Sequence, residues 1–417
     1  MKILWVKADK LLPVENGGNI RSYHVLRYLA SRHELTFYSY YGGEPDPAYE
    51  QELQRQLPGA VAMYTGKREL AGMGRGLDYL RHLGAEAPYA VSRFANAGVQ
   101  RRLGTWFAEN RFDVAVCDFL DAAVNFPTGL NIPSVLFQHN VESEIWRRHA
   151  ETARNPVRKM MYRMEFRKML RYEQSAVRRF QHVIAVSEND RSIMKQWVDA
   201  SHITVVPTGV DLAHYAPDPH TSNAGESDSA PLITFIGAMD WEPNVDGVGY
   251  FCGEVWEAIK REVPEARLRI VGRNPVPSVK KWASDSIEVT GRVPSVTEHL
   301  RQSSVVIVPL RIGGGTRLKI YEAMAAGKAV VSTTVGAEGL DVHRGRDIIL
   351  ADDAEAFSQA VIMLLRDSEL RSRYGRAAAE TAAHYDWTVI GQRFSEVLES
   401  AAEKKFVEAA ASPVRVA

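Results

Sequence analysis

The segment from Pro309 to Thr333 holds the residue types and spacing best suited to binding an anion. It predicts a buried strand, a turn of consecutive glycines at 313–315, and a helix from Arg317 to Ala326. Backbone amides at such a turn approach a phosphate closely, and the helix dipole favours negative charge at this end. Arg317 and Lys319 add two cations where helix stability would favour acids. The pattern indicates a phosphate site, and an ordinary β-α-β unit with a solvated basic helix start stays open as the alternative.

Three other positions complete this candidate site. Gly314 and Gly315 would bring the backbone close to the anion, and Thr316 suits the N-cap of the helix. Glu322 follows Lys319 by one helical turn, so the two share a face. A carboxylate on that face could accept hydrogen bonds from sugar hydroxyls.

Glycines and polar residues also follow several other predicted strands, at the sheet edge where open α/β folds bind ligands. Each has a plainer alternative: a turn, a helix cap, a structural histidine or a solvated arginine. In the first half these residues are Gly17, Gly18 and Arg21, then His139 with Asn140; in the second half they are Gly237, Asp240, Asn244, Gly272, Arg273, Gly291 and Arg292.

Short apolar strands alternate with amphipathic helices along the whole chain, which predicts an α/β protein with parallel sheets covered on both faces. The pattern occurs twice, so we expect two doubly wound, Rossmann-like domains that face each other across a cleft. The expected strands are 3–6, 34–40, 114–117, 134–138, 182–186 and 203–206, then 232–236, 267–271, 287–290, 305–309, 329–332 and 348–350.

A stretch rich in turn formers, 217–231, separates the two halves and reads as an exposed linker. We therefore expect an N-terminal domain at 1–215 and a C-terminal domain at 216–385. The last segment, 386–417, is helical in pattern. It either crosses back onto the first domain or caps the second.

Composition narrows the function classes. The 417 residues contain 51 Lys plus Arg and 51 Asp plus Glu, so no global field favours nucleic acid. Cys117 and Cys252 form neither a metal spacing nor a disulfide framework, which fits a reducing compartment. The start of the chain lacks the features of a signal peptide, and no window approaches 18 uncharged apolar residues. We expect a cytoplasmic protein.

Although the whole chain has equal numbers of basic and acidic residues, the segment at 147–179 is basic and amphipathic. It could contact an anionic membrane surface or receive a diphosphate-bearing acceptor. The alternative is a long helix that packs its apolar stripe on the sheet and solvates its charges.

Taken together, these motifs resemble the retaining, nucleotide-sugar-dependent glycosyltransferases of family 4 (group 1), which have the GT-B fold. The likeness covers nearly the full length and looks strongest for bacterial enzymes of exopolysaccharide or other cell-surface glycan synthesis. The residues that carry it are Gly17-Gly18, 139–142, 186–188, 206–211, 235–237, 271–272, 291–294 and 313–327.

The resemblance implies roles for individual residues. Glu322 would bind the nucleotide ribose, and His139 would face the transferred sugar. Arg317, Lys319 and His139 form the expected catalytic set. The other expected donor-binding residues are Gly17, Gly18, Gly237, Arg273, Arg292, Val293, Gly314, Gly315 and Thr316, and the acceptor-side candidates are Asn19, Arg21, Asp118 and Asn140.

Two positions depart from the family pattern. The first of the family's two glutamates would fall at Gly314, so the carboxylate that holds the donor sugar is missing. The usual Arg and Lys after the first strand of the second domain are also absent, because the chain has Ala238 to Trp241 there. Arg317 and Lys319 are where replacement charge could come from.

The expected activity is retaining transfer of a hexose from a nucleoside diphosphate sugar to a hydroxyl of a glycan, lipid-linked or small-molecule acceptor. A UDP-sugar is expected ahead of a GDP- or ADP-sugar, and neither a cofactor nor a metal is expected. The alternatives are a nucleotide-sugar epimerase and a non-catalytic nucleotide-sugar-binding subunit. The sequence does not identify the acceptor or the oligomeric state.

Overall fold

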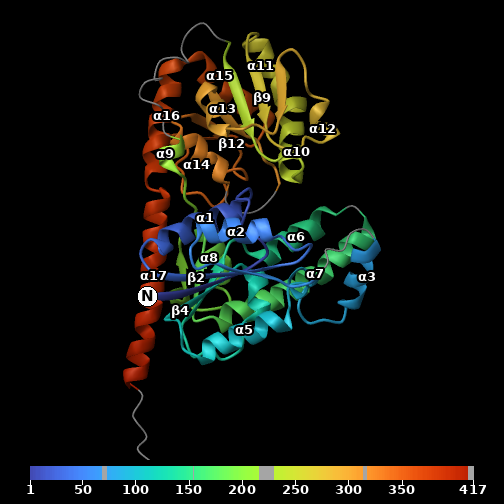
Figure 1. Ribbon diagram of the computed structural model, residues 1–417. Coiled ribbons are helices and arrows are strands. Elements are labelled where there is room, and N and C mark those ends of the chain that lie inside the picture. The colour runs from blue at the N-terminus through green and yellow to red at the C-terminus, as the bar shows by residue number, and fades with distance from the viewer. Residues whose placement is uncertain (68–72, 154, 216–229, 313–316, 412–417) are drawn as a thin grey trace, which may run out of the picture. The chain divides into compact units, whose positions relative to one another are not determined.

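The computed structural model describes residues 1–67, 73–153, 155–215, 230–312 and 317–411 (Figure 1). They form two compact units: Met1–Pro207 with the chain from Ile390 onward, and Thr208–Val389. The division comes before the expected boundary near residue 215. The reason is that Val210 pairs with Asp386, which ties the chain after Pro207 to the second unit.

Unit 1 is built on a fully parallel sheet in the order β3-β2-β1-β4-β5-β6-β7. Its inner strands are almost continuously apolar because helices cover both faces. The strands are β1 (Lys2–Ala8), β2 (Glu34–Tyr41), β3 (Val61–Tyr64), β4 (Val114–Asp118), β5 (Ser134–Gln138), β6 (His182–Ala185) and β7 (Ile203–Val205).

Several helices of unit 1 begin at a capping side chain. Asn16 accepts a hydrogen bond from the Asn19 amide at the start of α1, and Asn155 caps α7 just before Pro156. The helices are α1 (Gly17–Ala30), α2 (Pro47–Gln56), α3 (Met73–Arg81), α4 (Tyr89–Ser92), α5 (Ala97–Ala108), η1 (Leu120–Asn125), α6 (Glu142–Thr152), α7 (Pro156–Arg179), α8 (Glu188–Met194) and η2 (Ala200–His202).

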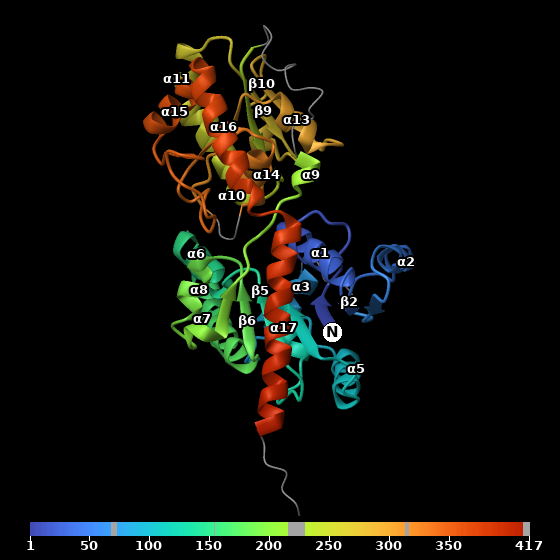
Figure 2. The same cartoon turned by 90° about the vertical axis from the view of Figure 1, so that its left-hand side faces the viewer.

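The C-terminal helix α17 (Trp387–Ala411) joins unit 1 from Ile390 onward. Figure 2 shows it running along the sheet of that unit. Phe394 packs on Trp5 and Phe137, with ring centroids 5.3 and 4.9 Å apart, so α17 completes the core beside β1 and β5. Large aromatic side chains of this kind contribute most of the burial that holds such a helix in place.

Unit 2 has a second parallel sheet, in the order β10-β9-β8-β11-β12-β13. Its strands are β8 (Leu232–Ile236), β9 (Arg267–Val271), β10 (Ile287–Gly291), β11 (Val305–Val308), β12 (Ala329–Ser332) and β13 (Ile349–Leu350). Its helices are α9 (Leu212–Tyr215), α10 (Glu242–Tyr250), the π-helical turn η3 (Phe251–Val255), α11 (Trp256–Glu262), α12 (Pro277–Lys280), α13 (Val296–Gln302), α14 (Leu318–Ala325), α15 (Ala354–Arg366) and α16 (Ser368–Ala383).

The α/β architecture and its two parallel sheets confirm the predicted fold class. One strand, β3, was not predicted. Helix α10 begins at Glu242 and continues into the π-helical turn η3. Gly17 and Gly18 were expected in a loop but lie in the first turn of α1.

Candidate active site

The helix after the glycine turn begins one residue later than expected, at Leu318, and Arg317 occupies its N-cap position. Three of the predicted donor-binding residues, Gly314, Gly315 and Thr316, lie outside the described residues. Arg317 is buried, and its guanidinium carbon lies 5.3 Å from the centre of the Trp241 ring. Stacking on an aromatic face lets a guanidinium remain charged where little water reaches it.

Lys319 is the second residue of α14, and its ammonium is held in a defined position. Nζ donates a hydrogen bond to Oδ1 of Asn244 (2.8 Å) and lies 4.5 Å from the centre of the Phe235 ring. Gly237 is needed beside it, because a Cβ there would come within 2.7 Å of Nζ. Burial, assisted by the nearby Arg317 charge, lowers the pKa of Lys319 to about 7, although Glu322 opposes the shift.

Glu322 follows on the same helix and is half-buried. Burial raises the pKa of its carboxyl group, against a hydrogen bond from Tyr215 and the charges of Lys319 and His214. The carboxylate is therefore held between a hydroxyl donor and a cation. This arrangement suits an acceptor of hydrogen bonds.

Neighbouring strand ends of this unit carry glycines that pack backbone against backbone. A Cβ on Gly272 would come within 1.6 Å of the Gly237 carbonyl oxygen, and the Gly272 amide donates to the Gly291 carbonyl (3.2 Å). Of the predicted donor-binding residues, Gly237 meets Lys319 and Asn244 directly. Arg273, Arg292 and Val293 lie on the loops that follow β9 and β10, with Arg292 exposed and the other two half-buried.

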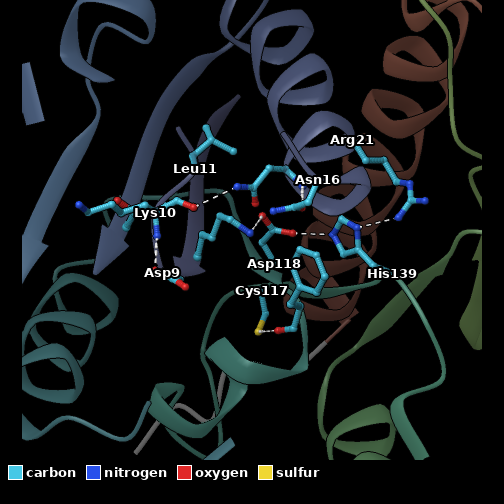
Figure 3. Close-up of polar contacts among 12 residues, drawn as sticks. Asp9, Lys10, Leu11, Asn16, Arg21, Cys117, Asp118 and His139 are labelled. Carbon is cyan, nitrogen blue, oxygen red and sulfur yellow. Dashed lines mark hydrogen bonds and ion pairs between the residues drawn. The ribbon is translucent and has the colours of Figure 1, made fainter. Parts of the chain in front are cut away.

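Unit 1 has a separate buried cluster at the carboxyl edge of its sheet (Figure 3). Asp118 lies at the end of β4, 2.7 Å from Nε2 of His139 and 3.6 Å from Nζ of Lys7. Arg21, from α1, donates to Nδ1 of His139 at 3.0 Å. All four side chains are buried, so their charges depend on nearby partners, which for Arg21 include Asp190 as well as Asp118.

The protonation of this cluster follows from its geometry. Arg21 can only donate, so Nδ1 of His139 accepts and the ring proton lies on Nε2, facing Asp118. Burial lowers the pKa of His139 to about 3, against the Asp118 charge. Burial opposes ionisation of Asp118, but Lys7 and the hydrogen bond from His139 outweigh it and lower the pKa to about 2.

His139 lies at the centre of this cluster. The ring is 1% exposed, both of its nitrogens are bonded, and it stacks on Phe119 with centroids 3.6 Å apart. Both ring nitrogens therefore contact Arg21 and Asp118, and a contact between His139 and the transferred sugar stays a prediction. Gly18 serves the same packing, because a Cβ there would lie 2.3 Å from the Phe119 ring.

The remaining acceptor-side candidates lie around this cluster. Asn19 donates to the Lys10 carbonyl (3.2 Å), and Gly17 begins α1 before it. Asn140 is half-buried and reaches the Glu142 carboxylate at 3.5 Å. The structure thus brings Arg21, Asp118 and His139 together and leaves the two asparagines on its margin.

Sequence reasoning missed two residues that the structure places in these sites. Lys7 carried a usable signal, because a lysine in a strand buried on both faces needs a partner. Tyr215 is 107 positions before Glu322 and gave no local signal. Among the described residues, no group of three or more metal-binding side chains comes together, and no helix has the length and apolar character to cross a membrane.

Comparison with known proteins covers both units. Residues 15–214 match the family described as Glycosyltransferase Family 4, and residues 230–367 match the family described as Glycosyl transferases group 1. The two matches fall on units 1 and 2 respectively. Each half of the chain therefore carries its own family signature.

Similar sequences include a phosphatidyl-myo-inositol mannosyltransferase of Mycolicibacterium smegmatis, 27% identical over 317 residues, or 74% of this chain and 76% of the relative. An uncharacterised 44.6 kDa protein from the cps region of Klebsiella pneumoniae is 23% identical over 87% of this chain and 90% of its own.

Solved structures with the same fold include HepE of Anabaena in complex with UDP, at a TM-score of 0.67 and 15% identity, covering 96% of this chain and all of the other. Sucrose-phosphate synthase of Thermosynechococcus elongatus superposes with a TM-score of 0.68 at 15% identity, covering 96% of this chain and 98% of the synthase. At such identities the likeness establishes the fold. Together with the two family matches, it identifies the chain as a family 4 glycosyltransferase with the two-domain GT-B fold.

Proposed function

We propose that this enzyme transfers a hexose from a nucleoside diphosphate sugar to a hydroxyl group, with retention at the anomeric carbon. The observation that carries the proposal is the position of Lys319. Its ammonium lies at the start of α14, fixed by Asn244 and Phe235, beside the Gly237 backbone. A cation preorganised at a helix N-terminus suits a diphosphate leaving group.

In this reaction the bond from the anomeric carbon to the diphosphate oxygen breaks, and a bond to the acceptor oxygen forms on the same face. The acceptor proton passes to the departing phosphate oxygen. The chain has to stabilise the negative charge that develops on the diphosphate, which is the role of Lys319 and Arg317. They supply the charge that this family usually carries after β8, where the chain has Ala238 to Trp241. Glu322 would accept hydrogen bonds from the nucleotide ribose.

For the acceptor, we propose a cavity of about 760 Å³ in unit 1, a volume typical of small-molecule sites. Its lining includes Asp9, Tyr41 and Thr65, at the carboxyl ends of β1, β2 and β3. Aromatic faces can pack on the C–H groups of a sugar or an inositol ring, and carboxylates can accept from its hydroxyls. The aromatic residues that line the cavity are Tyr40, Tyr41, Tyr89, Phe94 and Trp146, and the carboxylates are Asp9 and Asp78. Lys67 and Arg93 also line it.

A lipid-linked acceptor would bring the enzyme to the inner face of the cytoplasmic membrane, and the start of α7 offers a contact. The later part of α7 packs into the core through Met169, Ala176 and Val177, as in the plainer interpretation of the basic segment. Its first turns differ, because Val157 and Met160 are 71% and 69% exposed beside basic residues. Apolar side chains ringed by arginines favour an anionic membrane surface.

A thermal-shift screen of UDP-, GDP- and ADP-sugars tests the donor class before any acceptor is known. We expect a UDP-sugar to raise the melting temperature most, because ligands that bind only the folded state stabilise it. The Lys319→Ala variant should lose most of that shift while retaining the melting temperature of the free protein. No shift with any nucleotide sugar would refute the proposal.

A further inference from the structure

The short helix α9 has no role in the activity described so far, although it follows directly on the family motif at 206–211. It is fixed to unit 2 at several points. Val210 donates to the Tyr385 carbonyl (2.8 Å) and accepts from the Trp387 amide (3.2 Å). His214 shares a hydrogen bond of 2.8 Å with Thr297. The motif and its anchors therefore hold the last residue of the helix, Tyr215, in a set position.

Helix α9 packs against α14, which places Tyr215 beside that helix. Its hydroxyl is hydrogen-bonded to the carboxylate of Glu322, the residue proposed to bind the ribose. Burial first, and then the adjacent Glu322 charge, raise the pKa of the Tyr215 hydroxyl far above its usual value, so it stays a donor at every working pH. A carboxylate has two oxygens, so one can accept from Tyr215 while the other remains available.

The charged and titratable groups around Glu322 are few. Tyr215 and His214 approach it from α9, and Lys319 lies one turn before it on α14. Each of them favours the ionised carboxylate, whereas burial disfavours it. Removing the Tyr215 hydroxyl would therefore make Glu322 easier to protonate and would also free its side chain to rotate.

We propose that Tyr215 is a positioning residue for the donor: its hydroxyl orients the Glu322 carboxylate so that Glu322 can accept hydrogen bonds from the nucleotide ribose. The inference rests on the proposed function, since it requires a nucleoside diphosphate at this site. It also assigns a purpose to the motif at 206–211, which delivers Tyr215 to α14.

The test is a titration of the wild type and two variants with UDP, GDP, ADP and their 2′,3′-dideoxy analogues, by calorimetry. Tyr215→Phe removes only the hydroxyl. Tyr385→Phe is the matched control, because it removes a tyrosine hydroxyl of the same unit that donates to Asp341 (2.8 Å). Melting temperatures of all three proteins establish that they are folded.

We expect the wild type to bind one of the ribonucleotides at least about tenfold more tightly than its dideoxy analogue. The reason is that the analogue lacks the ribose hydroxyls that would donate hydrogen bonds to the charged Glu322. Tyr215→Phe should lose about fivefold or more of its affinity for the ribonucleotide and little for the analogue, and Tyr385→Phe should behave as the wild type. The acid limb of the affinity profile should also move to higher pH in Tyr215→Phe.

Three outcomes would overturn the inference, and they are distinguishable. If Tyr215→Phe discriminates between ribose and dideoxyribose as well as the wild type does, Tyr215 has no positioning role. If the wild type binds both ligands equally, Glu322 does not recognise the ribose. If the wild type binds no nucleoside diphosphate, the proposed function fails and the inference falls with it.

Discussion

Donor binding should depend on pH through Lys319. Without a ligand, its ammonium has a pKa of about 7, mainly because of burial. A bound diphosphate places negative charge beside it and favours the protonated form. The donor then binds most tightly below pH 7, where Lys319 is already charged. Its affinity falls as the pH rises, because binding must draw a proton from solution.

The size of the effect follows from Coulomb's law. A unit charge about 4 Å away contributes about 4 kcal/mol at an effective dielectric constant of about 20, which is about 3 pKa units. The pKa of Lys319 in the complex would then lie near 10. Affinity should fall roughly fiftyfold between pH 7 and pH 9, and binding should take up about 0.9 proton at pH 8 but about 0.1 at pH 6.

Calorimetry in buffers of different ionisation enthalpy measures this proton uptake directly. A nucleotide sugar is a better ligand than a nucleoside diphosphate, because its phosphates have no second ionisation in this range. Lys319→Ala provides the control: it should bind at least about tenfold more weakly at pH 7 and take up no proton. A wild type that takes up no proton at pH 8, or a Lys319→Ala variant that keeps the pH slope, would refute the reasoning.

The other predictions concern stability and membrane contact. Asp118→Asn leaves a buried ammonium without its counter-charge and should lower the free energy of unfolding by about 3–5 kcal/mol in urea titrations; a loss under about 1 kcal/mol would contradict the buried cluster. Gly209→Ala would place a Cβ 2.5 Å from the ring of Trp387 and should cost about 1–3 kcal/mol in the same assay, and a variant as stable as the wild type would contradict this packing. Replacing both Val157 and Met160 by Ser should reduce co-sedimentation with phosphatidylglycerol vesicles severalfold without changing the melting temperature, and equal co-sedimentation would rule out that contact.

Much of the fold could be predicted because buried parallel strands leave a strong sequence signal. Runs such as those at 305–309 and 329–332 are apolar throughout, and glycines or polar residues mark where they end. The strand β3 has only four residues and half-buried side chains, so its pattern is weak. The first turn of α1 was missed because paired glycines favour loops, whereas Asn16 caps a helix there and the Phe119 ring leaves no room for a Cβ at Gly18.

The sites could be predicted only in part. The rule that ligands bind at the carboxyl ends of strands located His139 and Gly237. It could not reveal that the His139 ring is closed in between Asp118 and Arg21, because that depends on side-chain packing between β4, β5 and α1. The role of Tyr215 could not be predicted for a similar reason, because its contact with Glu322 forms only when the chain folds.

The most direct test of the central claim is an assay of sugar transfer from the UDP-sugar that stabilises the enzyme best, across glycan and inositol-lipid acceptors. We expect acceptor-dependent release of UDP, a product whose anomeric configuration by NMR matches that of the donor, and a rate at least about tenfold lower in Lys319→Ala. Tight donor binding without transfer to any acceptor would indicate a binding subunit. An altered sugar formed without an acceptor would indicate an epimerase, and either result would contradict the account.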